Sequence, residues 1–391
     1  MDNLQCTWSY NDLFIGTRNN VAQCCMQGKG WDAPDWNTIT NLNEWYANFE
    51  PFIEVRNQHL KNIQNIECKR CWNYENKNIP SSRIRTNGKQ IEDFGSLPVV
   101  PEVKRIELRF SNKCNLRCRM CDGNSSSQIQ NLVNELLDKG IKDTYTTDVI
   151  NYKEFQNIEK LLDLIIKCET IEEIQVAGGE PFIMPEVEWL LKELVKHNKT
   201  HISLKFITNL TSTKTKIIEL IKKFKKVEFD LSIDGIGDVI EYQRYPVKWK
   251  TVEKNFLSLY RHQNKDFKLK FTPCISHLNL FGLSDLINWS RNYPEVTWGF
   301  NLVNSPSYLD YRLIPLEYRK DLIKELQNID IDFMPYYVRQ MYKNFFEKGI
   351  SDFREITDKE KQQLKDAINF WDYKSLLKYS NIYPWNKELN K

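Results

Sequence analysis

Three cysteines near the middle of the sequence have a spacing that could hold a metal cluster. They lie in the run Ser111-Asn-Lys-Cys114-Asn-Leu-Arg-Cys118-Arg-Met-Cys121. Thiolates at this spacing can converge from one tight loop. A [4Fe–4S] cluster bound by three thiolates keeps one iron open for another ligand, whereas structural zinc usually takes four protein ligands. On spacing alone, the run fits either such a cluster or half of a zinc site whose fourth ligand lies elsewhere.

The segments around this run alternate between the periods of strands and helices. We expect strands at 104–110, 171–177, 202–207, 226–232, 267–275 and 296–302. Between them we expect helices at 154–168, 185–197, 214–224, 251–262 and 283–291, and beyond residue 315 the chain is mostly helical in pattern. Such alternation predicts parallel strands joined by helices, with functional residues at the carboxyl ends of the strands.

Short motifs follow these strands in order. Gly178-Gly179-Glu180-Pro181 comes after the second strand, Thr208-Asn209 after the third, and Ser232-Ile-Asp234-Gly235 with Arg244 after the fourth; the fifth ends near His277 and Asn279. With the Cys-x-x-x-Cys-x-x-Cys run after the first strand, this ordered set resembles the radical S-adenosylmethionine (SAM) superfamily. The resemblance extends over about residues 104–303.

The resemblance implies an α/β fold with a partial (β/α)6 TIM-like barrel at 101–315 and a helical C-terminal extension at 316–391. It implies a catalytic [4Fe–4S] cluster on Cys114, Cys118 and Cys121, with SAM chelated to the open iron. Positions similar to those that hold SAM in relatives are Gly178, Gly179, Glu180, Pro181, Thr208, Asn209, Ser232, Asp234, Arg244 and Asn279. One electron, from a donor such as flavodoxin or ferredoxin, would cleave SAM into methionine and a 5′-deoxyadenosyl radical that abstracts hydrogen from the substrate.

The first hundred residues carry a second group of cysteines, in Cys6-Thr-Trp8, Cys24-Cys25 and Cys68-Lys-Arg-Cys71-Trp72. A Cys-x-x-Cys pair with two distant thiols is a four-ligand set, which suits zinc or a [4Fe–4S] cluster. We expect metal to replace a large apolar core here. The arrangement is similar to a SPASM/twitch auxiliary module placed before the barrel, at 1–100. By that resemblance, Cys6, Cys24, Cys68 and Cys71 would ligate an auxiliary [4Fe–4S] cluster, with Cys25 as the alternative to Cys24 and a structural zinc knuckle as the alternative site.

Composition limits the class of protein. The chain has 391 residues, 41% of them hydrophobic and 27% charged, which is too apolar for disorder. The net charge of +3 does not call for a nucleic-acid partner. No apolar run reaches the length of a membrane helix, and Met1-Asp2-Asn3 does not begin a secretion signal, so we expect a cytoplasmic protein without a membrane partner.

The leading hypothesis for function is therefore an enzyme that abstracts hydrogen from an unreactive C–H bond. A peptide or protein is the first expectation for the substrate, and a small molecule such as a sugar, a nucleotide or an amino-acid derivative is the alternative. A non-catalytic metal protein that binds nucleic acid is a remote third possibility. The sequence does not place the residue that quenches the substrate radical, so the reaction type stays open.

Overall fold

The computed structural model describes residues 4–76, 80–141, 152–153, 155, 157–299, 301–303, 306–344, 357–373 and 375–383. The chain divides into two compact units. The first comprises Met1–Asn112, Asn151–Phe206 and Thr215–Val227, and the second comprises Lys113–Ile150, Ile207–Lys214 and Glu228–Lys391.

The N-terminal segment contributes strands to the sheet of the first unit. Helix α1 (Trp8–Asn11) leads into β1 (Asp12–Gly16), which pairs antiparallel with β2 (Asn20–Ala22), and β2 pairs antiparallel with β3 (Trp31–Asp32). On its other side β1 runs parallel to β4 (Arg105–Leu108). The Arg105 guanidinium donates to both oxygens of the buried Asp12 carboxylate at 2.8 Å, which links the two strands by an ion pair.

An aromatic core supports this N-terminal segment. Helices α2 (Leu42–Asn48) and α3 (Glu50–Leu60) pack beside α1, and α4 (Lys69–Glu75) and α5 (Ser82–Phe94) follow. Trp36, Tyr46 and Phe52 are almost fully buried, and the Tyr46 and Phe52 rings meet edge to face with centroids 5.3 Å apart. The expectation that metal replaces a large apolar core here is therefore wrong, because aromatic side chains bury enough area to form one.

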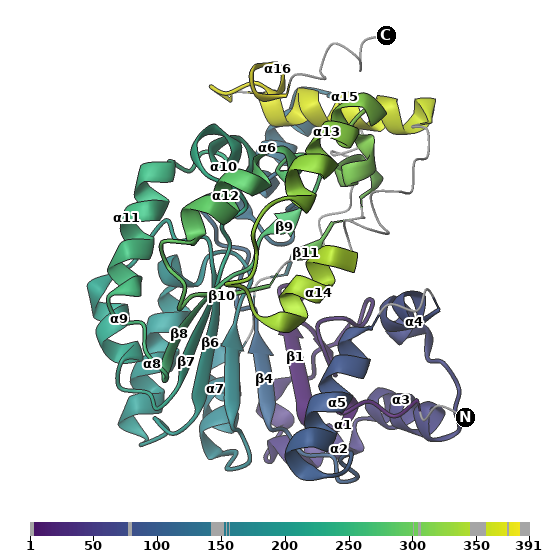
Figure 1. Cartoon of the computed structure of the whole chain (residues 1–391). Helices are drawn as coiled ribbons and strands as arrows, with labels where there is room; N and C mark the ends of the chain where they lie inside the picture. Colours follow the sequence, from purple (N-terminus) through teal and green to yellow (C-terminus); the bar gives the residue numbers. More distant parts are fainter. Residues whose placement is uncertain are drawn as a thin grey trace. The chain divides into compact units, whose positions relative to one another are not determined.

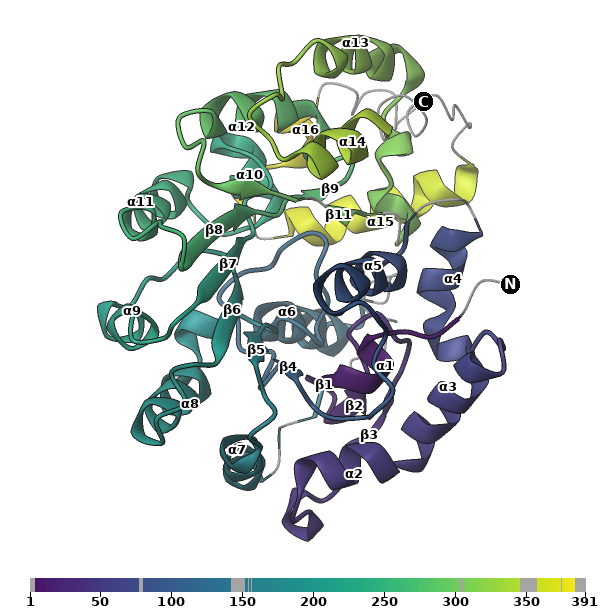
Figure 2. The same ribbon diagram turned by 60° about the horizontal axis from the view of Figure 1, so that its bottom comes forward.

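The rest of the first unit is a parallel strand-and-helix layer. Strand β5 (Glu173–Val176) lies between β4 and β6 (Ser203–Thr208), in register Ile106↔Ile174↔Leu204. Helices α7 (Ile158–Lys167), α8 (Pro185–Lys196) and α9 (Thr215–Ile221) lie along one face of these strands (Figures 1 and 2). The apolar residues that alternate along β4 and β5 are buried, which explains why this face takes the helices.

The second unit repeats this pattern and then becomes helical. Its strands are β7 (Val227–Leu231), β8 (Phe267–Phe271) and β10 (Thr297–Trp298), in the order β10-β8-β7, and a separate parallel pair joins β9 (Cys274–Ile275) to β11 (Asn301–Leu302). The helices are, in chain order, α6 (Ser127–Asp138), α10 (Gly237–Gln243), α11 (Trp249–Tyr260), α12 (Leu283–Ser290), α13 (Leu316–Gln327), α14 (Tyr336–Asn344), α15 (Asp358–Asp372) and α16 (Tyr379–Ile382).

The structure is thus an α/β fold with mostly parallel strands, and each strand expected from the sequence overlaps an observed one. Two expected strands are broken: 267–275 becomes β8 and β9, and 296–302 becomes β10 and β11. The first break falls at Pro273, which has no N–H to donate to a ladder. The division into units also differs from the expected boundary near residue 100, since β1 pairs with β4; the assignments of 1–100, 101–315 and 316–391 stay predictions.

No helix in the described part of the chain is long and apolar enough to span a membrane.

Candidate functional site

The central cysteines lie on the loop that enters α6 in the second unit. The N–H of Cys114 donates to Ser127 Oγ at 3.2 Å, and Ser126 Oγ donates to the Leu116 carbonyl at 2.6 Å. The N–H of Cys121 donates to the Cys118 carbonyl at 3.0 Å, which closes a turn between the last two cysteines. These bonds hold the loop against the first turn of the helix, and they fix the direction in which it carries its thiols.

Burial governs the protonation of these thiols. Desolvation raises the pKa of Cys118, and the neighbouring Arg244 guanidinium opposes this rise. The pKa of Cys121 is well above its ordinary value because of burial first, and then because of the negative charges of Cys118, Asp122 and Cys114. A metal cluster would have to displace these protons, so assembly at this loop should be favoured by higher pH.

The end of β6 contacts the first cysteine. Asn209 Nδ2 lies 3.9 Å from Cys114 Sγ and donates to Asn115 Oδ1 at 3.3 Å. Asn115 in turn donates to Thr211 Oγ1 at 2.9 Å. Between them, Leu210 is fully buried with φ +58°, a left-handed conformation that is uncommon for a leucine. The loop after β6 is therefore held in one strained shape beside the cysteine loop.

A buried ion pair contacts the second cysteine. Arg244 Nε donates to Asp234 Oδ2 at 2.6 Å, and Arg244 Nη1 lies 3.8 Å from Cys118 Sγ. Asp234 Oδ1 accepts the N–H of Cys274 at 2.8 Å. The Asn279 amide accepts from the Ser276 N–H at 2.8 Å and donates to the carbonyls of Asp234 and Cys274. Asp234 and Asn279 thus use their side-chain polar atoms on the protein itself, which suits positioning rather than direct contact with a ligand.

We expect Arg244→Met to destabilise the protein strongly, because it leaves the fully buried Asp234 carboxylate without a cation. The cost should be about 3–5 kcal/mol of unfolding free energy. Denaturant unfolding of the apoprotein measures it. The double variant Arg244→Met/Asp234→Asn removes both charges and should recover part of the loss; a single variant as stable as the wild type would contradict the pairing.

Two tyrosines that the sequence analysis missed cover the arginines of the cysteine loop. Arg119 is buried, with its guanidinium 4.5 Å from the Tyr242 ring centroid, and that of Arg117 lies 4.8 Å from the Tyr245 ring. The N–H groups of Arg117 and Arg119 also donate to the carbonyls of Tyr245 and Gln243. The tyrosines lie on either side of Arg244 in the sequence. This grouping of aromatic and cationic residues is the sequence signal that could have indicated the cation–π contacts.

The run Gly178–Pro181 belongs to the first unit, where it follows β5. Gly178 and Gly179 have φ of +75° and +30°. A Cβ on Gly178 would lie 2.9 Å from Arg109 Cβ, so a side chain has no room there. Glu180 is fully buried, and its Oε1 accepts the N–H of Phe182 at 3.1 Å, which caps the short helix Pro181–Ile183. The glutamate therefore has a structural task in addition to its expected role.

Gly179→Val should weaken SAM binding by at least about tenfold while the metal content stays unchanged, since the backbone there is expected to approach the SAM amino group. SAM titration and metal analysis measure the two effects. Gly95→Val is the matched control, because Gly95 has φ +76° with open space around it and tests backbone strain alone. Equal affinity in Gly179→Val and the control would mean that this Gly-Gly is only a turn.

The four predicted N-terminal ligands line one cavity of the first unit. Cys6, Cys24, Cys68 and Cys71 come from three distant segments and meet around it. Cys25 is not among the described residues that line this cavity. The structure therefore favours Cys24 over Cys25 as the member of this cysteine group.

Other side chains complete the wall of this cysteine cavity: Trp8, Met26, Gln27, His59 and Arg83. Gln27 Nε2 lies 3.8 Å from Cys68 Sγ, and Arg83 is fixed by a 2.6 Å ion pair with Glu75. Burial lowers the pKa of His59 to about 4 and raises the pKa of Cys6 and of Cys68 to about 12. The cavity thus brings four thiols together beside polar N–H donors, and thiols are ligand types of both zinc and iron–sulfur clusters.

Within the described residues, no three His, Cys, Asp or Glu side chains are arranged to hold a metal ion.

Comparison with known proteins assigns the central segment. Residues 108–280 match the model of the Radical SAM superfamily. This segment is similar to the radical SAM superfamily. The matched segment contains the central cysteine loop and every predicted SAM-binding residue. A match to this superfamily implies a [4Fe–4S] cluster and SAM as cofactors, and the central loop carries three cysteines, the number that leaves one iron of such a cluster open.

Three similar proteins illustrate the range of the match. Radical SAM cyclopropyl synthase TigE of Paramaledivibacter caminithermalis is 29% identical over 54% of this chain and 44% of its own length. An uncharacterized protein of Methanocaldococcus jannaschii is 21% identical over 63% of this chain and 77% of its own. SuiB of Streptococcus suis, solved with bound SAM, aligns over 76% of this chain and 60% of its own, at 13% identity and a TM-score of 0.40. This chain thus spans less than half of the length of TigE.

Proposed function

We propose that this chain is a radical SAM enzyme that cleaves SAM reductively and abstracts hydrogen from its substrate. The observation that carries the proposal is the loop of Cys114, Cys118 and Cys121 inside the matched segment. Asn209 lies against Cys114 Sγ, and Arg244 lies against Cys118 Sγ. When bound, the cluster and SAM supply the one-electron chemistry. The cysteine loop holds the cluster, and the residues around it set its position and its electrostatic surroundings.

The protein groups have separable tasks in this proposal. The Arg244 guanidinium places a positive charge near Cys118 Sγ and favours its thiolate, and Asp234 holds that guanidinium in place. Asn209 offers an N–H to Cys114 Sγ. Thr208 ends β6, and Ser232, which follows β7, donates its N–H to the Thr208 carbonyl at 2.9 Å; both are proposed SAM contacts. Gly178 and Gly179 present bare backbone, with the capped Glu180–Pro181 turn behind them.

The N-terminal cysteine cavity is proposed to hold an auxiliary [4Fe–4S] cluster on Cys6, Cys24, Cys68 and Cys71. Its support is that four thiols from distant segments line one cavity with N–H donors from Gln27, His59 and Arg83. Zinc is the alternative occupant, since four thiolates suit it equally. With all four irons held by protein, the auxiliary cluster would transfer electrons or stabilise the fold rather than bind substrate.

The substrate class follows the sequence-based expectation. A peptide is proposed first and a small molecule second, with flavodoxin or ferredoxin as the type of electron donor. The name of TigE gives cyclopropyl synthesis as the activity of that protein. Because this chain spans 44% of the length of TigE, we propose only hydrogen abstraction, and not cyclopropyl synthesis, as the reaction of this chain.

Anaerobic reconstitution with iron and sulfide tests the proposal. The reconstituted protein, given SAM and dithionite, should form 5′-deoxyadenosine and methionine in equal amounts. Deuterated peptide and metabolite pools then identify the substrate class by transfer of deuterium into 5′-deoxyadenosine. A protein that assembles its clusters and forms no 5′-deoxyadenosine would contradict the proposed activity.

A further inference from the structure

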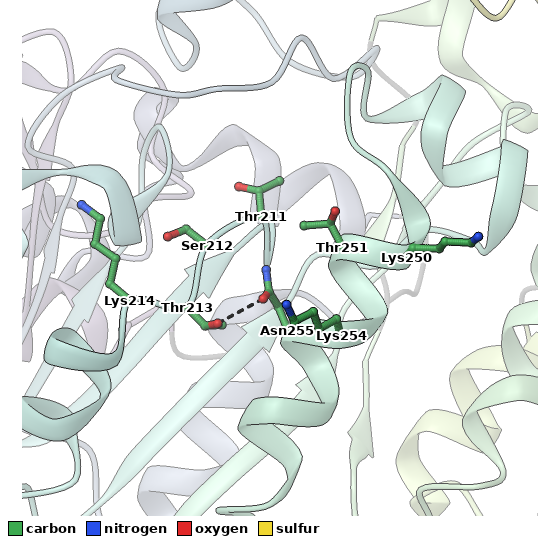
Figure 3. A pocket seen from close by; sticks show the side chains of 8 residues that line it. All are labelled: Thr211, Ser212, Thr213, Lys214, Lys250, Thr251, Lys254 and Asn255. Carbon is green, nitrogen blue, oxygen red and sulfur yellow. Dashed lines mark hydrogen bonds between the residues drawn. The ribbon is translucent and has the colours of Figure 1, made fainter.

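A second cavity lies in the second unit, and its lining side chains have no role in the proposed cleavage of SAM. It has a volume of about 510 Å³ and is open to solvent. One wall is the segment 211–214 after β6, and the other is the first half of α11 (Figure 3). Two kinds of side chain line it. The ammonium groups are those of Lys214, Lys250 and Lys254, and the neutral hydrogen-bonding groups are those of Thr211, Ser212, Thr213, Thr251 and Asn255.

The ammonium groups make this cavity positive. Lys250 and Lys254 are one helical turn apart on α11, so they lie on the same side of it, and Lys214 comes from the opposite wall. No carboxylate is among the described residues of the lining, and none of the three lysines forms an ion pair within the described part of the chain. This differs from the neighbouring Lys216 and Lys248, which pair with Glu188 and Glu241.

The walls between the lysines are held in place. Asn255 Nδ2 donates to the Leu210 carbonyl at 2.7 Å, and Thr213 Oγ1 donates to Asn255 Oδ1 at 3.1 Å, the bond drawn in Figure 3. Thr211 is bonded to Asn115 of the cysteine loop. The side chains of Lys214 and Lys250 lie at opposite sides of the view, with Lys254 beside Asn255 between them. Thr211, Thr213 and Asn255 therefore form a fixed base, and the exposed lysines have long flexible side chains that can turn toward a shared ligand.

We propose that this cavity binds the phosphate or diphosphate group of a small molecule. The three ammonium groups and the hydroxyls of Ser212 and Thr251 are able to donate, and a phosphate offers several charged acceptor oxygens. The size of the cavity is that of a small-molecule site. The inference is independent of SAM cleavage, and its test uses the whole chain without added clusters.

Calorimetric titration with inorganic pyrophosphate tests the site. The wild type should bind, and Lys250→Ala/Lys254→Ala should weaken binding by at least about tenfold, since it removes two charged donors. The matched control is Lys320→Ala/Lys324→Ala, which removes two exposed lysines at the same spacing on α13 and the same net charge. It should bind as the wild type does.

A further variant and a further ligand sharpen the result. Ser212→Ala leaves the charge unchanged and should weaken binding by about threefold, because it removes one hydroxyl donor. If uridine 5′-diphosphate binds more tightly than pyrophosphate, the cavity recognises more of a phosphorylated small molecule than its diphosphate group. If the two bind equally, the cavity recognises the diphosphate group alone. Either result supports the site. No binding by the wild type, or equal loss in both lysine pairs, would overturn it. Unchanged thermal midpoints verify that the variants are folded.

Discussion

Replacing Cys114, Cys118 and Cys121 together with alanine should abolish formation of 5′-deoxyadenosine and remove about half of the iron. The three thiols sit on one loop, bonded to the start of α6, and the predicted auxiliary ligands lie elsewhere in the sequence. The loss of activity should be complete, because SAM has no other open iron in the proposed scheme. Iron analysis and anaerobic SAM cleavage measure the two effects.

Cys168→Ala is the matched control for this triple variant. Cys168 is also buried, but it follows α7, and its Sγ contacts Thr170 rather than another cysteine. It should keep the iron and the activity of the wild type. Deoxyadenosine formation by the triple variant would remove the central loop from the proposed catalytic site.

Replacing Cys68 and Cys71 with alanine should remove the other half of the iron, keep SAM cleavage at least in part, and abolish substrate turnover. The central loop has its own three thiols, whereas the cysteine cavity would lose two of its four. The thermal midpoint should fall by about 5 °C or more, because metal binding at such a site contributes to folding. The drop should stop short of unfolding, since the buried Trp36, Tyr46 and Phe52 core remains.

Cys25→Ala is the control for this pair, because Cys25 is adjacent in sequence to Cys24 and is not among the described residues lining the cavity. It should retain iron, turnover and thermal midpoint. Full iron in Cys68→Ala/Cys71→Ala would show that these thiols are not ligands. Recovery of zinc in the wild type, with half the expected iron, would make the site structural and exclude electron transfer through it.

The sequence was informative wherever function depends on residues close together along the chain. Cys114, Cys118 and Cys121 span eight residues, so their spacing indicates one ligand loop, and their position after the first expected strand favours a [4Fe–4S] cluster over half of a zinc site. The alternation of Ile106 and Leu108 marks β4 because a strand with one apolar face has a period of two. The end of β6 then places Asn209 near the loop, since parallel strands end at one edge, whereas Arg244 reaches Cys118 from the end of α10.

Contacts between distant segments were decided by tertiary structure. The parallel pairing of β1 with β4 joins residues about ninety positions apart and depends on the buried Asp12–Arg105 pair, which no local pattern reveals. The same holds for Asp234 and Asn279, whose polar atoms turn out to be bonded to the protein.

The choice between Cys24 and Cys25 separates what the sequence determines from what the tertiary structure decides. The sequence determined that four thiols in the first hundred residues suit one metal site, because residue type sets donor chemistry. Adjacent residues have nearly the same sequence environment, so spacing cannot separate them. Only the fold, by turning one side chain into the cavity with Cys6, Cys68 and Cys71, distinguishes Cys24 from its neighbour.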